Sequence, residues 1–176
     1  MKATSLLLSF FTLLGCSHSL PSEREADADR LATQNGWHQT TLKTASFELI
    51  SYSPKNTSQN EVLTVYIEGD GFAWRTSRQP SADPTPHNPI ALKLALKHHN
   101  GAAAYLARPC QYHEDVENTP LCTQSYWTNK RYAEEVLSAS EQALTQLKGN
   151  YGANKLILVG YSGGAAVAAL LAARRD

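Results

Sequence analysis

The pattern of apolar and polar positions predicts short strands separated by helices. Segments 37–42 and 47–52 are rich in β-forming residues and predict an antiparallel pair of strands. Short apolar runs at 62–67, 102–106 and 155–159 predict further strands, and the first of these suits burial on both faces of a sheet. The centre of a sheet is therefore expected to begin at residue 62.

Three segments carry helix signals. An acidic stretch that opens with a capping-box pattern predicts a short helix ending at Asn35-Gly36. Asn88 and Pro89 are suited to cap and open a second helix that runs to His99. Asn129 is expected to open the clearest amphipathic helix, whose stripe comprises Ala133, Val136, Leu137, Ser140, Leu144 and Leu147.

The order of these elements predicts an α/β fold. Strands that alternate with helices make a mostly parallel sheet with right-handed crossovers and helices on both faces. Residues 72–89 lack any period and predict a long irregular loop over the C-terminal edge of the sheet. A chain of 176 residues with 42% hydrophobic content suits one core, and no repeat or second domain is visible.

The start of the chain has the character of an export signal. Lys2 precedes an apolar run, 6–14, that is too short to span a bilayer, so residues 1–15 are expected to be a signal peptide. Its end, Leu13-Leu14-Gly15-Cys16, resembles the lipobox of bacterial lipoproteins, in which a lipid is attached to the cysteine. The alternative is an ordinary secretory signal in which Cys16 is incidental.

A lipid on Cys16 would make the protein a lipoprotein of the bacterial cell envelope. Ser17, rather than an aspartate, after that cysteine favours the outer membrane facing the periplasm. Residues 16–36 are then expected to form a tether and the short N-terminal helix.

The balance of charges bears on the possible partners of the protein, and the number of cysteines bears on its disulfides. Sixteen Lys and Arg balance sixteen Asp and Glu, which argues against a nucleic-acid partner and against a basic stripe that attracts anionic membranes. If Cys16 carries lipid, Cys110 and Cys122 remain as a pair in an oxidising compartment and predict a disulfide. The alternative is two buried free thiols.

One motif carries chemistry. Gly160-Tyr161-Ser162-Gly163-Gly164 matches Gly-x-Ser-x-Gly and lies between an apolar strand and the small-residue run 165–171, as a nucleophile elbow requires. The glycines allow strand and helix to approach closely, so the Ser162 hydroxyl is presented above the sheet. Gly163 N–H, at a helix N-terminus, is the expected oxyanion donor.

The alternative interpretation of this motif is a glycine-rich turn of a nucleotide-binding fold. The chain contains neither Gly-x-Gly-x-x-Gly nor a P-loop, and no His/Cys/Asp spacing resembles a zinc site, so neither a cofactor nor a metal is predicted. A second oxyanion donor is expected from Glu68-Gly69-Asp70-Gly71, through Asp70 N–H or Gly71 N–H.

Four stretches together resemble a known family: 67–71, 108–110, 126–127 and the motif at 160–164 are similar to uncharacterised α/β-hydrolases of proteobacterial lipoproteins. The resemblance implies that residues 37–176 form the N-terminal part of an α/β-hydrolase domain. It implies no particular substrate.

The same resemblance implies roles for individual residues. Ser162 would be the nucleophile of a serine hydrolase, Asp70 and Gly163 would form the oxyanion hole, and Cys110 and Cys122 would be linked. The expected substrate is a small or lipid-like acyl compound, with a carboxylic ester first, then a thioester or amide.

The chain differs from this family in its catalytic base. The family's chain order places an acid and then a histidine after the nucleophile, but residues 163–176 contain no histidine and Asp176 follows too soon to be the acid. We therefore expect a fragment, truncated after the elbow helix. His87, in the long loop, would be a base only in a different order of the triad, and a loop histidine is the ordinary interpretation.

The alternative function belongs to another class. The chain would then be a non-catalytic cell-envelope lipoprotein that uses the hydrolase fold as a binding module, with a ligand in the cleft above the sheet.

Overall fold

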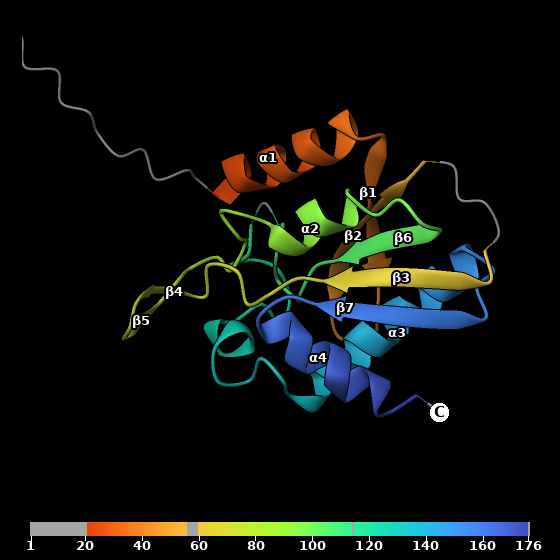
Figure 1. The fold of residues 1–176 in the computed structure, drawn as a ribbon. Coiled ribbons are helices and arrows are strands. Elements are labelled where there is room, and N and C mark those ends of the chain that lie inside the picture. The colour runs from red at the N-terminus through yellow and green to blue at the C-terminus, as the bar shows by residue number, and fades with distance from the viewer. Residues whose placement is uncertain (1–20, 56–59, 114, 176) are drawn as a thin grey trace, which may run out of the picture.

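A computed structural model describes residues 21–55, 60–113 and 115–175 (Figure 1). The predictions for the signal peptide, Cys16, Ser17 and Asp176 lie outside these residues. In the described part of the chain, no helix is long and apolar enough to cross a membrane.

The chain alternates between strands and helices along most of its length, as predicted. In order, the elements are α1 (Pro21–Gln34), β1 (Trp37–Lys43), β2 (Glu48–Pro54), β3 (Val62–Ile67), β4 (Trp74–Thr76), β5 (Gln79–Pro80), α2 (Ile90–Ala95), β6 (Ala102–Leu106), a 3-10 helix (Gln124–Trp127), α3 (Glu134–Asn150), β7 (Lys155–Gly160) and α4 (Gly163–Ala172).

A mixed sheet of five strands, in the order β1-β2-β6-β3-β7, organises the described residues. β6, β3 and β7 are parallel, and Val65 of β3 lies between Ala104 of β6 and Leu158 of β7. β2 runs antiparallel to β6 and joins β1 in the predicted antiparallel pair. The protein is therefore an α/β protein with a mixed, largely parallel sheet.

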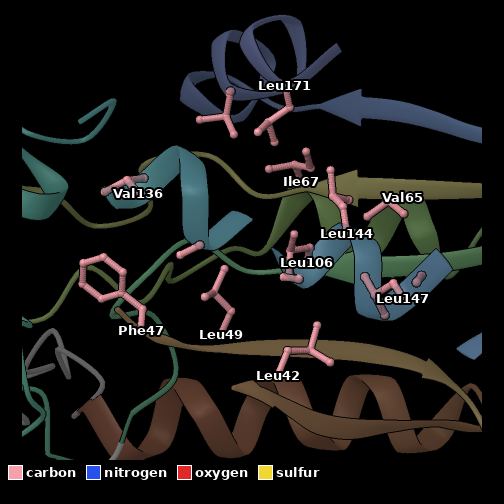
Figure 2. Packing of buried hydrophobic residues seen from close by; sticks show 14 of the residues in the cluster. Leu42, Phe47, Leu49, Val65, Ile67, Leu106, Val136, Leu144, Leu147 and Leu171 are labelled. Atoms are coloured by element: carbon pink, nitrogen blue, oxygen red, sulfur yellow. The ribbon is translucent and has the colours of Figure 1, made fainter. Parts of the chain in front are cut away.

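Helices cover both faces of this sheet (Figure 1). Because side chains alternate along a strand, Leu63, Val65 and Ile67 of β3 face the core beneath α3 and α4. Tyr66 of β3 packs with the opposite core, which includes residues of α1 and α2. Figure 2 shows the larger core, in which Leu144 of α3 and Leu171 of α4 meet the strands.

The long loop was predicted without regular structure, and this was wrong in one part. β4 and β5 form a two-stranded antiparallel hairpin within residues 72–89. The hairpin escaped the prediction because residues 74–79 are all exposed and so have no apolar alternation to reveal them. The turn is held by Thr76 Oγ1, which accepts hydrogen bonds from the backbone N–H groups of Arg78 and Gln79.

Two helix boundaries also differ from the prediction. α2 ends at Ala95 rather than at His99, because the N–H groups of Lys97 and His98 bond three residues back and form turns. The side chain of Asn88 does not cap α2 but accepts a hydrogen bond from Lys93 Nζ at 2.6 Å. α3 begins at Glu134 rather than at Asn129.

Candidate active site

Ser162 lies in the turn between β7 and α4 and is one of the non-glycine residues with a positive φ. Its φ of 52° and ψ of −122° form a strained combination for a residue with a side chain. The residue is exposed, and its hydroxyl makes no capping hydrogen bond to α4. The sequence-predicted turn therefore exists, with the hydroxyl available to a ligand.

The flanking glycines allow this turn because the backbones there leave no room for a side chain. A Cβ on Gly160 would overlap the carbonyl oxygen of Gly164. A Cβ on Gly164 would overlap the carbonyl oxygens of Ile67 and Glu68, at the end of β3. The close approach of strand and helix expected from the motif is thus present.

Asp70 approaches the start of α4 with its carboxylate, a contact that the sequence did not reveal. A Cβ on Gly163 would overlap this carboxylate. Arg108 Nη1 lies 3.3 Å from Asp70 Oδ1, and Arg131 Nε lies 3.5 Å from Oδ2. Burial lowers the pKa of Arg108, whereas the charge of Asp70 raises it. Two cations and a helix N-terminus thus balance the carboxylate beside Ser162.

The placement of Arg131 also explains why α3 starts late. The carbonyl oxygen of Arg131 accepts a hydrogen bond from Arg108 Nη2, and its guanidinium donates to the carbonyl oxygen of Thr128. These contacts hold residues 128–131 in turns beside the site. The helix can begin only after them, at Glu134.

A pocket of about 310 Å³ opens beside Ser162. Its lining brings together two of the predicted positions, Asp70 and Gly71, with Ser162. Gly163 is buried at the start of α4, and its N–H makes no backbone hydrogen bond within the described part of the chain. The oxyanion role of these three residues stays a prediction.

Glu68 is a buried carboxyl group in the same pocket that sequence reasoning missed. Its Oε1 accepts hydrogen bonds from the N–H groups of Gly69, at 3.0 Å, and Ala91, at 3.4 Å. Its Oε2 has no hydrogen-bond partner among the described residues. Burial raises the pKa of Glu68, although the backbone N–H groups oppose this effect. An acidic residue directly after a buried strand was the signal available in the sequence.

His87 lines this pocket together with Ser162. Its ring packs edge-on against Phe72, with 4.6 Å between ring centroids. His98 is bound to Tyr66 and Asn100, and His113 is bound to the carbonyl oxygen of Glu48. Tertiary structure thus brings the histidine of the long loop to the pocket that Ser162 also lines, which sequence order alone did not favour.

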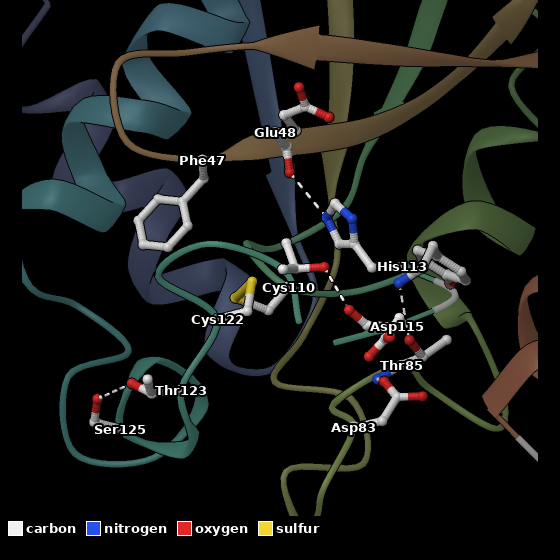
Figure 3. The surroundings of a disulfide bond; sticks show 12 residues. Phe47, Glu48, Asp83, Thr85, Cys110, His113, Asp115, Cys122, Thr123 and Ser125 are labelled. Atoms are coloured by element: carbon white, nitrogen blue, oxygen red, sulfur yellow. Dashed lines mark hydrogen bonds between the residues drawn. A yellow bond between two sulfur atoms is a disulfide. The ribbon is translucent and has the colours of Figure 1, made fainter. Parts of the chain in front are cut away.

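The predicted disulfide between Cys110 and Cys122 is present, with 5.5 Å between the Cα atoms (Figure 3). A loop closed over a sequence separation of 12 stabilises the fold by about 3 kcal/mol in the chain-entropy model. The loop also supports the site, because Gln111 Nε2 donates to the carbonyl oxygen of Gly69 at 3.0 Å. Tyr112 N–H donates to Thr85 Oγ1 at 2.8 Å.

Arg24 of helix α1 contacts the connection that lines the pocket. Its guanidinium forms a buried ion pair with Asp83 at 2.8 Å and donates to the carbonyl oxygen of Thr85. It also lies over the ring of Phe72, 5.6 Å from the centroid. The predicted N-terminal helix is therefore packed onto the connection that lines the pocket.

No family model, characterised protein or solved structure matches this chain significantly. Its class is defined by its own geometry, which is an α/β fold with a serine in a strained strand-to-helix turn. Within the described residues, no group of three His, Cys, Asp or Glu side chains is arranged to hold a metal ion.

Proposed function

We propose that the protein is a serine hydrolase of the α/β-hydrolase type that acts on an acyl bond, with a carboxylic ester as the first candidate. The observation that carries this proposal is the conformation of Ser162, whose exposed hydroxyl sits on a strained turn at the edge of a pocket. Strain at a single residue that is enforced by surrounding backbone is typical of functional sites.

In the proposed reaction, Ser162 Oγ attacks the ester carbonyl while a base takes the hydroxyl proton, and the alcohol leaves with that proton as its C–O bond breaks. Water then attacks the acyl-enzyme, which releases the acid and restores the Ser162 hydroxyl. Gly163 N–H and a donor from Asp70 or Gly71 stabilise the oxyanion. His87 is the histidine that lines the pocket, and it is the first candidate among the described residues to accept the hydroxyl proton.

A fluorophosphonate probe tests this function, because it labels only an activated serine. The wild-type chain should label, and Ser162→Ala should not. Ser77→Ala, which removes an exposed hydroxyl on the hairpin, is the matched control and should label like the wild type. Equal labelling of the wild type and Ser162→Ala would rule out Ser162 as the nucleophile.

The same assay with His87→Gln assigns the base. Labelling reduced by about a hundredfold or more indicates that His87 activates Ser162, which is the usual size of general-base catalysis. Labelling at the wild-type rate means that the base lies elsewhere.

A non-catalytic binding module is the second candidate function. It is favoured by the edge-on packing of His87 against Phe72, which gives this ring a structural use. A chain that binds ester analogues in the pocket but never labels at Ser162 would support this candidate.

We further propose that the protein is held in the cell envelope by a lipid on Cys16, at the outer membrane facing the periplasm. Mass analysis of the mature protein tests it. A diacylglycerol-modified cysteine at the new N-terminus is the expected result, and an unmodified Cys16 within a longer chain would contradict it.

A further inference from the structure

The β4–β5 hairpin carries an exposed aromatic side chain beside exposed basic ones. Trp74 is 45% exposed, whereas Trp37 and Trp127 are 8% and 4% exposed. Arg75 and Arg78 flank the turn, are exposed, and form no ion pair with another described residue. The hairpin thus presents an aromatic ring and two unpaired cations to the surroundings.

This local charge differs from that of the whole chain, which has a formal net charge of zero. Residues 71–82 contain no Asp or Glu, so nothing within the segment neutralises the two arginines. The first acid after it, Asp83, is buried in the ion pair with Arg24. Acidic and basic residues balance over the whole chain, which argues against attraction to an anionic membrane, but they do not balance at the hairpin.

The hairpin projects from the carboxyl end of the parallel strands, near the start of α1 (Figure 1). Its base is joined to the first turn of α1, because Arg24 contacts both Phe72 and Asp83, which flank the hairpin in sequence. The hairpin and the beginning of α1 are therefore held at the same end of the molecule.

We propose that this hairpin docks the protein on an anionic phospholipid surface. Trp74 would lie at the headgroup level, where the ring can be apolar on its faces and hydrogen-bonded at its N–H. Arg75 and Arg78 would contact lipid phosphates, for which a guanidinium is well suited. The three residues do not line the Ser162 pocket, so this surface is independent of the proposed hydrolase chemistry.

The small size of the hairpin favours a lipid surface over a protein partner. A stable protein interface uses about 800 Å² per partner, or about twenty to thirty residues a side. The exposed stretch 74–79 offers far fewer residues than this. An interfacial site, in contrast, needs only an aromatic residue and a few cations.

Fluorescence quenching of Trp74 in the full chain tests the proposal. Vesicles of phosphatidylglycerol with brominated acyl chains should quench a part of the emission that Trp74→Phe lacks. Brominated phosphatidylcholine vesicles should quench that part less. Because the reporter is Trp74 itself, the signal depends on the depth of this ring in the bilayer. Equal quenching of the wild type and Trp74→Phe would overturn the proposal.

Charge variants test the role of the two arginines. Arg75→Gln/Arg78→Gln should weaken the vesicle affinity measured through Trp74 by about 30-fold at low salt, if each cation contributes as a basic residue near an anionic surface does. Lys55→Gln/Lys155→Gln makes the same change in charge at the opposite end of the sheet and should match the wild type. An equal loss in both pairs, or no loss in the arginine pair, would refute the proposal. Unchanged thermal unfolding of each variant would show that it is folded.

Discussion

Two connections run from the adjacent parallel strands β3 and β7 to the pocket, and they are stabilised in opposite ways. The one after β7 consists of Tyr161 and Ser162 and is enforced by backbone packing around Gly160 and Gly164. The one after β3 spans residues 68–89 and is held by side chains from distant parts of the chain.

The long connection receives its contacts from segments far away in the sequence. Arg24 reaches it from α1, Gln111 and Tyr112 from the disulfide loop, and Trp127 Nε1 donates to the carbonyl oxygen of Ser81 at 3.1 Å. The side of the pocket that follows β7 therefore depends on local backbone geometry, and the side that follows β3 depends on tertiary contacts. Each can be broken separately.

The largest expected effect is on the long connection, through Arg24→Met. Removing one partner of a buried ion pair leaves Asp83 uncompensated and should lower the free energy of unfolding by about 3–5 kcal/mol. Urea unfolding measures this loss. Arg30→Met is the matched control, because its pair with Asp27 is exposed and should contribute less than about 1 kcal/mol. Equal losses in the two variants would mean that the buried ion pair does not stabilise the long connection.

The short connection should be broken by Gly164→Ala. The added methyl group meets backbone carbonyl oxygens of β3, which cannot move without displacing the strand, so we expect a loss of about 1–3 kcal/mol. Gly149→Ala in α3 is the control, because nothing lies within 4 Å of a Cβ there. It should be neutral or stabilise the helix by up to about 1 kcal/mol. If Gly164→Ala loses no stability in the same unfolding assay, backbone packing is not the cause of the turn.

The smallest effect is a pH dependence that comes from Glu68. Its pKa is raised in the folded state, so above about pH 4.5 the unfolded chain releases this proton first. Stability should therefore fall as the pH rises from about 4.5 through the folded pKa, and Glu68→Gln should lack this fall. Thermal unfolding of both proteins across that pH range measures the difference.

Glu134 provides the control for this pH experiment. Arg174 lowers the pKa of this exposed carboxyl group, so its contribution is lost as the pH falls through the folded pKa, which is the opposite direction. Glu134→Gln should therefore leave the decline at rising pH in place. The same slope in the wild type and Glu68→Gln would exclude Glu68 as its source.

Much of the framework could be predicted because it depends on neighbouring residues. The apolar runs of β3, β6 and β7 match the observed strands, and α1 ends at Gln34 before Gly36, whose φ is 74°. The elbow around Ser162 was also predictable, because its glycines are required within a few residues of the serine.

Other features could not be predicted because their cause is remote in sequence. Arg108 and Arg131 meet Asp70 only after the sheet and the disulfide loop have formed. The hairpin has no buried face, so no periodic pattern marks Trp74. His87 looked like an ordinary loop residue until the fold brought it to the pocket.

The strands of the five-stranded sheet, the pairing of Cys110 with Cys122 and the strained turn at Ser162 could be predicted from the sequence, because periodicity, a small set of cysteines and glycine spacing are local properties. Which side chains surround that serine depends instead on how distant segments pack together. The contacts of Glu68, His87 and Asp70 join chain segments that no short-range rule connects, since packing two layers of helices against one sheet determines which of them meet.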